Sequence, residues 1–253
     1  MVQLRVKNTR AVRLPYRLLI VAVIASSFVG ASFASATECV VLLHGLARSS
    51  MSLNKMQRAL EEDGYLTANV DYPSRDHEIA ELAEIAVGDG LKQCREEPGL
   101  QKIHFVTHSL GGILVRQYLS KRGIPELGRV VMLGPPNQGS AAADQMENVP
   151  GFDWLNGPAG RQLGKGEDSV PLALGPVNFE LGVIAGNRTI DPITSAILEN
   201  PDDGRVSVED TRIEGMDDFV VVEHSHAFMM RMQKPIELTK LFLHTGSFTA
   251  TTN

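Results

Sequence analysis

The sequence has few cysteines and none of the common nucleotide- or metal-binding patterns, and each shortage excludes a class of protein. Two cysteines in 253 residues form at most one disulfide, so the fold is not built on disulfides. No G-x-G-x-x-G or Walker pattern occurs, and His224-Ser225-His226 has no third metal ligand at a matching spacing. We therefore expect no bound metal and no cofactor.

Long apolar runs are also absent, except near the amino end. Residues 1–17 carry five basic side chains and no acidic one, and residues 18–36 are uncharged and largely apolar. A basic segment, an apolar run and a closing Ala34-Ser35-Ala36 are typical of a secretory signal that is cleaved after Ala36. The alternative is an uncleaved anchor over residues 18–36, which would associate the protein with a membrane. The sequence thus predicts an exported protein, either periplasmic or secreted, or one anchored in a membrane.

Residues 37–253 are poor in basic charge. Without residues 1–36, 19 of the 24 basic side chains and all 30 acidic ones remain, which gives a formal charge of −11. This excess argues against nucleic acid or an anionic membrane surface as a partner. The remaining 217 residues suit a single domain, and no repeat or linker divides them. Cys39 and Cys94 form either a disulfide or two buried thiols, and the sequence leaves both states open.

Short apolar segments alternate with helical patterns along residues 37–253. Apolar, often β-branched runs predict six strands, at 40–43, 65–70, 103–106, 128–133, 180–185 and 219–222. Apolar residues at helical spacing predict helices at 52–62, 78–95, 112–121 and 235–244. The alternation is typical of an α/β protein with a mostly parallel sheet of about six strands and helices on both faces.

Residues 141–180 follow no such pattern. Apolar and aromatic residues are scattered there among glycines and prolines, which break helices. We expect a loop-rich insertion over the carboxyl edge of the sheet, without the long amphipathic helix that a moving lid uses. The sequence leaves open whether this insertion is a structural wrap or a minimal, loop-like cap that faces a substrate.

The most informative stretch is Thr-His-Ser-Leu-Gly-Gly at 107–112, between a predicted strand and a predicted helix. Strand, sharp turn and helix with a serine at the apex is the setting of a nucleophile elbow, which exposes the serine Oγ at the carboxyl edge of the sheet. Gly111 supplies the small residue that the pattern needs after Ser109, whereas Thr107 replaces its first glycine. The alternative is that Ser109 only caps the following helix.

A serine nucleophile needs a histidine to take its proton and a carboxylate to orient that histidine. In this architecture both residues follow the serine, each in a loop after a late strand. An Asp-Asp-Gly turn follows the fifth predicted strand, and His-Ser-His follows the sixth. We prefer Asp203 to Asp202 because Gly204 lets the chain turn tightly behind it. We prefer His226 to His224 because an apolar run follows it directly.

Acyl transfer also needs backbone N–H groups that bind the oxyanion of the intermediate. Leu110, directly after the serine, is the first candidate, and Leu46, in the loop after the first predicted strand, is the second. Two other histidines have simpler interpretations. We expect His44 to fix this loop by hydrogen bonding and His108 to pack beneath the serine.

Five motifs occur in the order VVLLHGLARSS, THSLGG, LGPPNQGS, PDDGRVSVEDT and VEHSHAFMM. Together they resemble bacterial α/β-hydrolases of the small lipase and esterase type, over residues 39–231. The resemblance implies an α/β-hydrolase fold with a triad of Ser109, Asp203 and His226. The sequence departs from the family pattern at Thr107, and it lacks a recognisable long helical lid.

The resemblance implies an enzyme that cleaves a small-molecule or lipid ester through an acyl-enzyme and needs no cofactor. A thioesterase or an acyltransferase would use the same triad. A binding protein would keep the scaffold without the activity, since a fold does not determine a function. The sequence leaves the natural substrate, its acyl length and the oligomeric state open.

Overall fold

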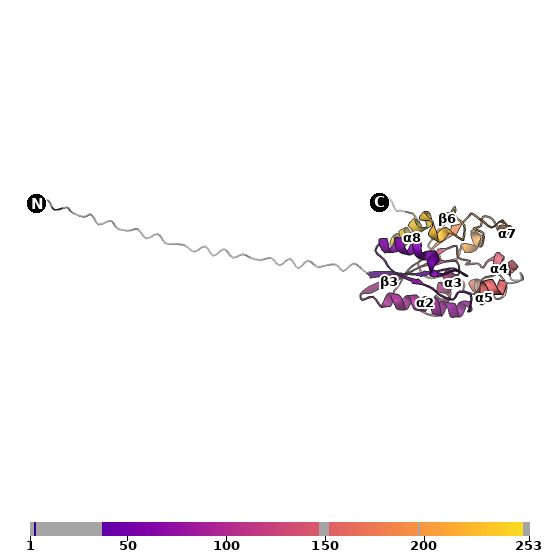
Figure 1. Ribbon diagram of the computed structural model, residues 1–253, viewed down its shortest axis with the longest axis horizontal. Helices are drawn as coiled ribbons and strands as arrows, with labels where there is room; N and C mark the ends of the chain where they lie inside the picture. Colours follow the sequence, from indigo (N-terminus) through magenta and orange to yellow (C-terminus); the bar gives the residue numbers. More distant parts are fainter. Residues whose placement is uncertain (1–2, 4–36, 147–151, 197, 250–253) are drawn as a thin grey trace. The chain divides into compact units, whose positions relative to one another are not determined.

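The computed structural model describes residues 3, 37–146, 152–196 and 198–249, so the predicted signal cleavage site lies outside the described residues. Neighbouring strands are all parallel, and their order in the sheet is β2-β1-β3-β4-β5-β6. In Figure 1, β3 lies between α8 on one side and α2 on the other. The predicted parallel sheet is therefore confirmed. Its six strands are β1 (Thr37–Leu43), β2 (Leu66–Val70), β3 (Leu100–His108), β4 (Leu127–Leu133), β5 (Leu181–Gly186) and β6 (Asp218–Val222).

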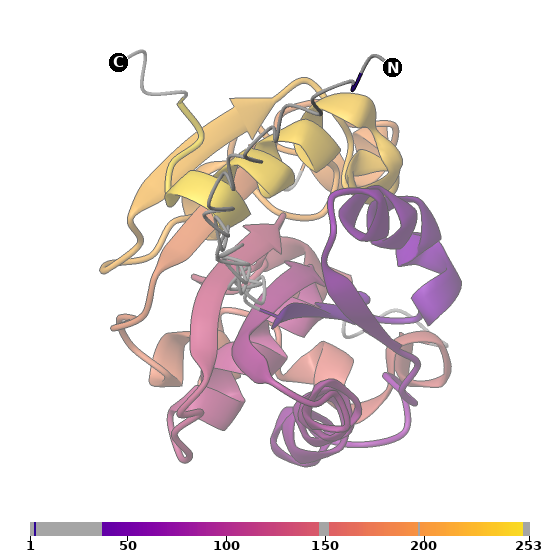
Figure 2. The same ribbon diagram turned by 90° about the vertical axis from the view of Figure 1, so that its left-hand side faces the viewer.

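Helices cover both faces of the sheet (Figure 2). Because side chains alternate along a strand, β1 sends Val41 and Leu43 into one core and Val40 and Leu42 into the other. All four side chains are fully buried, which explains why this strand is a continuous apolar run. The first core packs against α2 (Ile79–Arg95) and α3 (Leu110–Leu119), and the second against α1 (Asn54–Glu62), which follows the 3-10 turn η1 (Ser50–Leu53), and α8 (Gln233–Thr245).

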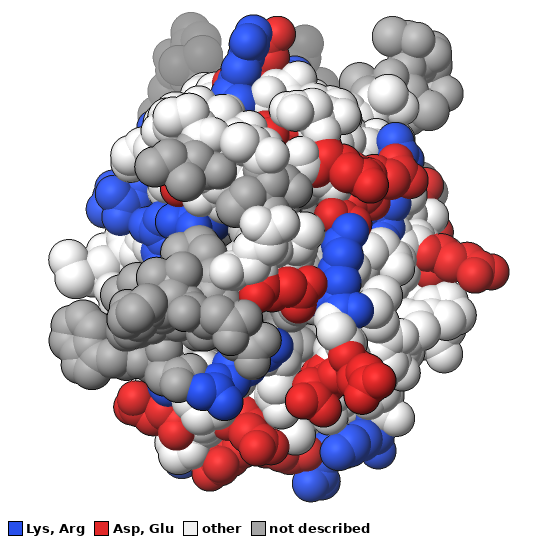
Figure 3. Space-filling view, turned by 90° about the vertical axis from the view of Figure 1, so that its right-hand side faces the viewer, with Lys and Arg blue, Asp and Glu red and all other residues white. Residues whose placement is uncertain are grey.

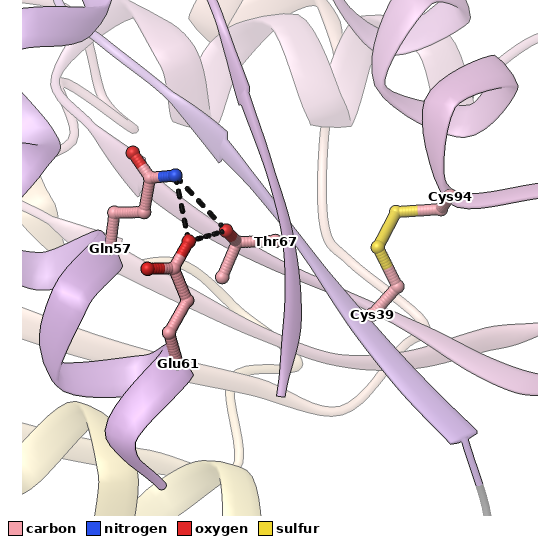
Figure 4. Close-up of a disulfide and its surroundings, with 5 residues drawn as sticks. All are labelled: Cys39, Gln57, Glu61, Thr67 and Cys94. Atoms are coloured by element: carbon pink, nitrogen blue, oxygen red, sulfur yellow. Dashed lines mark hydrogen bonds between the residues drawn. A yellow bond between two sulfur atoms is a disulfide. The ribbon is translucent and has the colours of Figure 1, made fainter. Parts of the chain in front are cut away.

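Different bonds tie α1 and α2 to the sheet (Figure 4). α2 is joined to β1 by a disulfide between Cys39 and Cys94, whose Cα atoms are 5.8 Å apart. α1 is joined to β2 by hydrogen bonds, in which the Thr67 hydroxyl donates to the Glu61 carboxylate at 2.6 Å and the Gln57 amide donates to Thr67 at 3.2 Å. The disulfide spans a sequence separation of 55 residues. In the chain-entropy model a loop of that size stabilises the fold by about 4 kcal/mol.

The expectation of a loop-rich insertion at 141–180 is wrong in part, because this stretch contains short helices. Of these, α5 is interrupted at Gly157, whose φ is 63°, and resumes at Pro158, since proline fits the first turn of a helix. α6 is capped by Ser169, whose hydroxyl accepts a hydrogen bond from the Leu172 N–H. Local caps thus form helices where the composition predicts loops. The three helices are α4 (Ala141–Met146), α5 (Phe152–Arg161) and α6 (Val170–Ala173), and none exceeds 10 residues.

The segments after β5 and β6 contain further short helical turns. They are α7 (Pro192–Ser195) and η2 (Glu209–Thr211) after β5, and η3 (Met229–Arg231) after β6. They shape the loops that carry Asp203 and His226. In the described part of the chain no helix is long and apolar enough to span a membrane.

Candidate active site

The register of the sheet brings several loops together at its carboxyl edge. Leu43 of β1 lies beside Thr107 of β3, and His108 of β3 lies beside Leu133 of β4. Neighbouring strands therefore end level with one another. The Ser109 N–H donates to the Leu133 carbonyl at 2.9 Å, which extends the ladder by one residue and anchors the elbow.

Ser109 has a backbone conformation that non-glycine residues rarely adopt. Its φ is 53° and its ψ is −119°, and such strain costs of order 1–3 kcal/mol. Ser109 precedes α3, but its hydroxyl makes no capping hydrogen bond, so helix capping does not explain the residue. Gly111 explains how the turn is accommodated, because a Cβ there would lie 2.5 Å from the Leu43 carbonyl oxygen.

Thr107, which replaces the first glycine of the elbow pattern, faces a second glycine. The Thr107 side chain is fully buried. A Cβ at Gly112 would lie 3.3 Å from Thr107 Oγ1 and 3.0 Å from Met132 Sδ. Because Gly112 has no side chain, α3 packs close to β3 although position 107 is β-branched.

Asp203 and His226 lie in contact, after β5 and β6 respectively. His226 Nδ1 is 2.7 Å from Asp203 Oδ2, and both side chains are buried. The other carboxylate oxygen accepts the N–H groups of Arg205 at 3.0 Å and Val206 at 2.9 Å. The His226 N–H donates in turn to the Asp203 carbonyl at 2.9 Å. The pair is therefore held by the backbone at both ends, and Nε2 of His226 makes no hydrogen bond within the described residues.

The other member of each sequence pair lies elsewhere. The Asp202 carboxylate accepts the Ser195 hydroxyl at 2.6 Å and the Gly204 N–H at 2.7 Å, so it closes its own loop. The His224 N–H donates to the Val222 carbonyl at 2.8 Å, and its side chain is partly exposed. Neither Asp202 nor His224 lines the cavity described below.

Gly134, which the sequence does not single out, lies directly against the acid–histidine pair. Its φ is 56°, and a Cβ there would lie 3.0 Å from both Asp203 Oδ2 and His226 Nδ1. Any side chain at this position would push the pair apart. The available signal is the abrupt Gly-Pro-Pro that ends the fourth predicted strand.

His108, the residue before the serine, supports His226 from inside the protein. Its Nε2 donates to the His226 carbonyl at 3.0 Å, and the two ring centroids are 4.7 Å apart. Burial lowers the pKa of His108 well below the ordinary 6.5, and the charges of His226 and Arg48 lower it further. His108 is thus a neutral side chain that packs beneath the elbow, as expected.

The loop after β1 is held by His44 and Tyr72. Their rings stack with centroids 4.0 Å apart, and the Tyr72 hydroxyl donates to the His44 carbonyl. His44 Nδ1 donates to the Gly45 carbonyl at 2.8 Å, while Nε2 accepts the Tyr72 N–H at 3.3 Å. Burial lowers the pKa of His44, which favours this neutral form. The loop therefore presents Leu46 to the cavity in a fixed shape.

Ser109 and His226 line one cavity of about 300 Å³. Most of its other lining residues are small or apolar, and they come from the loop after β1, from the helices of the 141–180 stretch and from the loop after Asp203. Two arginines, Arg48 and Arg205, also line it, and the sequence does not single them out. The apolar lining residues include Leu46, Ala142, Ala143, Leu163 and Val206.

Solved structures with the same architecture include bacterial lipases and an esterase. Bacillus licheniformis lipase BlEst2 in its mature form has a TM-score of 0.64 at 20% identity, over 83% of this chain and 92% of that chain. The metagenomic carboxyl esterase MGS0156 has a TM-score of 0.59 at 21% identity, over 76% and 65%. Staphylococcus hyicus lipase has a TM-score of 0.58 at 13% identity, over 81% and 93%. At these identities the likeness shows the fold alone.

No curated protein matches the sequence. A family model does match, namely that of the alpha/beta hydrolase fold, over residues 38–170. This range is more than half of the chain, and it includes the loop after β1 and the serine elbow. The protein belongs to the α/β-hydrolase fold family.

Proposed function

We propose that this protein is a serine hydrolase that cleaves carboxylic esters. Ser109 is the nucleophile, His226 is the general base and then the acid, and Asp203 orients His226. One observation carries the proposal: His226, which is hydrogen-bonded to Asp203, lines the same cavity as a serine held at a φ of 53°. A carboxylate, an imidazole and an elbow serine are the parts that acyl transfer requires.

The reaction runs in two halves. In the first, Ser109 Oγ bonds to the acyl carbon as His226 Nε2 takes its proton, and Asp203 stabilises the imidazolium. The ester C–O bond then breaks, and His226 gives the proton to the leaving alcohol. In the second half, His226 takes a proton from water, the hydroxide attacks the acyl-enzyme, and Ser109 recovers a proton as the acid leaves.

The backbone N–H groups of Leu46 and Leu110 bind the oxyanion of each tetrahedral intermediate. Donors in this role contribute about 3 to 4 kcal/mol each. Leu46 lies in the loop that His44 and Tyr72 fix. Leu110 is the first residue of α3, where N–H groups lack intrahelical acceptors and the helix dipole favours negative charge.

The cavity favours a small substrate. A volume of about 300 Å³ is at the low end for ligand pockets, and the walls are mainly apolar. None of the helices described at 141–146 and 152–180 has the length of a moving lid. The substrates are therefore soluble esters with short to medium acyl chains, and no lipid interface is needed to expose the serine.

The enzyme acts after export, as a single domain over residues 37–253. The Cys39–Cys94 disulfide supports this location, because disulfides persist in oxidising compartments. The acidic charge of these residues favours a small-molecule substrate over a nucleic acid.

A fluorophosphonate probe tests the proposed nucleophile. The probe should label the purified protein, and peptide mapping should place the label on Ser109. Ser109→Ala should remove the label while the unfolding temperature stays unchanged. Ser140 also lines the cavity, so a label on Ser140 would contradict the assignment, and absence of labelling on folded protein would favour a binding role.

A series of p-nitrophenyl esters tests the substrate class. Each CH₂ that still meets an apolar wall favours binding by up to about 0.8 kcal/mol, so KM should fall with acyl length and then level off. The rate should follow the dissolved ester and show no jump at the solubility limit. Strong activation on emulsified triglyceride, with little turnover of dissolved butyrate, would contradict this part of the proposal.

A further inference from the structure

The residue before the proposed nucleophile is a buried histidine. His108 is 1% exposed, ends β3 and lines the cavity beside Ser109. Its Nε2 atom is 3.0 Å from the His226 carbonyl oxygen, across a sequence separation of 118 residues. A carbonyl oxygen can only accept a hydrogen bond, so Nε2 must carry the proton that it donates. This hydrogen bond ties the backbone of the proposed base to the residue next to the nucleophile.

The backbone of His226 is held from two sides. Its N–H donates to the Asp203 carbonyl at 2.9 Å, and its carbonyl accepts the hydrogen bond from His108. Among the described residues no other group donates to that carbonyl. Asp203 therefore fixes the base relative to the acid, and His108 fixes it relative to the elbow that carries Ser109.

The other ring nitrogen of His108 faces the loop after β1. Nδ1 is buried and has no hydrogen-bond partner in the described part of the chain. A Cβ at Gly45 would lie 2.8 Å from this nitrogen and 3.2 Å from Ser109 Cβ. The ring thus packs against the backbone of the loop that carries Leu46. Because Nδ1 makes no hydrogen bond, a phenylalanine ring at this position would remove the donor at Nε2 and no other hydrogen bond.

The His108 ring is neutral, which suits its place beside the base. Burial lowers its pKa well below the ordinary 6.5, the charges of His226, Arg48 and His44 lower it further, and the hydrogen bond to the His226 carbonyl opposes them. The two ring centroids are 4.7 Å apart. His226 becomes an imidazolium during the proposed reaction, and a positive charge at this distance would oppose that step. A neutral donor holds the base without this repulsion.

We propose that His108 is a positioning residue of the hydrolase, whose hydrogen bond to the His226 carbonyl keeps His226 within reach of Ser109 in both halves of the reaction. The inference rests on the proposed function and adds a residue on which its rate depends. In this role His108 neither gives up nor takes a proton. The effect belongs to kcat, because misplacing the base slows proton transfer, whereas the walls that bind the ester stay in place.

Two replacements of His108 separate the donor from the ring. His108→Phe keeps a flat ring and removes the donor, so kcat for p-nitrophenyl butyrate should fall about 10- to 100-fold, with KM within about twofold, as a misplacement near 1 Å would cause. His108→Gln offers an amide N–H near the position of Nε2, so it should recover most of kcat. Turnover is divided by the number of sites that a fluorophosphonate labels to completion, so that loss of folded protein is not counted as loss of kcat.

His104, on the same strand, provides a matched control. It is also 1% exposed, its Nδ1 accepts the Arg129 N–H at 2.8 Å, and its Nε2 lies 3.2 Å from Glu38. It does not line the cavity. His104→Phe should therefore lower the unfolding temperature and leave kcat per labelled site unchanged. Charged side chains of both signs lie on the face that carries α4, α5 and α7 (Figure 3), so all variants are compared at one pH and one salt concentration.

A double-variant cycle tests whether His108 acts through His226. His108→Phe should lower kcat far less in a His226→Ala background than in the wild type, because a base that is absent cannot be misplaced. A general disturbance of the elbow would instead reduce kcat by the same factor in both backgrounds.

The outcomes separate the inference from the function on which it rests. An unchanged kcat per labelled site in His108→Phe would overturn the inference and leave the proposed function intact. The same conclusion would follow from an equal loss in His104→Phe, from equal losses in both backgrounds, or from a His108→Gln variant no faster than His108→Phe. If Ser109→Ala and His226→Ala both retain wild-type turnover, the proposed function and the inference fall together.

Discussion

Two Asp–His pairs in the described part of the chain lie within 3 Å, and they differ in their surroundings much more than in their geometry. His226 Nδ1 is 2.7 Å from Asp203, and His244 Nε2 is 2.6 Å from Asp63. Each histidine also has a hydroxyl group nearby. The proposed nucleophile shares a cavity with His226, and the Tyr65 hydroxyl is 3.4 Å from His244 Nδ1. Distance alone therefore does not distinguish a catalytic pair from a structural one.

The Asp63–His244 pair is engaged in other contacts. The His244 side chain is 52% exposed, and the Lys240 ammonium lies 2.7 Å from the second oxygen of Asp63. Burial alone would raise the pKa of Asp63, but hydrogen bonds from Lys240 and His244 outweigh it and lower the pKa. Burial raises the pKa of Tyr65 to about 12, so its phenol stays protonated. This pair joins α8 to the end of α1, and its contacts are those of a structural ion-pair network.

The Asp203–His226 pair differs from the surface pair in the other groups that bind the carboxylate. Backbone N–H groups bind one oxygen of Asp203, no lysine of the described residues pairs with its carboxylate, and both side chains of the pair are buried. The second oxygen of the Asp203 carboxylate, Oδ2, therefore contacts the His226 ring without a competing cation among the described residues. The proposed catalytic pair thus differs from the surface pair in its remaining partners and in the cavity that His226 lines, and variants of the two sites test whether these differences matter.

The largest expected effect is loss of the nucleophile. Ser109→Ala should lower kcat for p-nitrophenyl butyrate on the order of 10⁶-fold, as removal of a triad serine does. Tyr65→Phe removes the corresponding hydroxyl of the surface pair and should leave kcat unchanged. Comparable losses of kcat in the two variants would mean that the two Asp–His pairs do not differ in their role in catalysis.

The next effect is loss of the base. His226→Ala should lower kcat about 10⁴-fold or more, because it removes the group proposed to take the serine proton. His244→Ala should leave kcat within about twofold, since an exposed ion pair contributes little beyond local stability. His224→Ala should also cost far less than His226→Ala, and the reverse result would show that the base is assigned to the wrong histidine.

Changing the acid should have a smaller effect. Asp203→Asn should lower kcat about 10³- to 10⁴-fold, because the amide no longer favours the imidazolium or the correct tautomer. Asp63→Asn should leave kcat unchanged and lower the free energy of unfolding by no more than about 1 kcal/mol. Activity of Asp203→Asn near the wild-type level would remove Asp203 from the mechanism.

The smallest effect concerns stability at acidic pH. His108 has a pKa well below the ordinary 6.5, chiefly because of burial, so below pH 6.5 the unfolded chain binds a proton that the folded chain does not. The contribution of neutral His108 to the free energy of unfolding is therefore fully present above pH 6.5. It is lost as the pH falls, by up to about 1.4 kcal/mol per pH unit. His108→Gln should flatten this slope in thermal unfolding between pH 7 and pH 5. An unchanged slope would mean that other groups cause it.

Much of the fold follows from local pattern. The six strands and four main helices appear near their predicted positions, because burial imposes a period of two on strands and 3.6 on helices. The helices at 141–180 were not predicted, because short helices depend on caps such as Ser169 more than on composition. The disulfide was left open for a similar reason, since the distance between Cys39 and Cys94 depends on how α2 packs on β1.

Local order along the chain was sufficient to indicate the elbow at Ser109 and to favour Asp203 and His226, since turn residues beside a strand end act within a few positions. Contacts between loops at the carboxyl edge of the sheet could not be predicted from the sequence, because they form only when the chain is folded. The approach of Gly134 to the acid–histidine pair, and the meeting of Arg48 with Arg205 in one cavity, follow from the register of β1, β3, β4 and β5. Residues so distant in sequence carry no shared pattern, and only parallel strands that end level bring their loops within reach of one ligand.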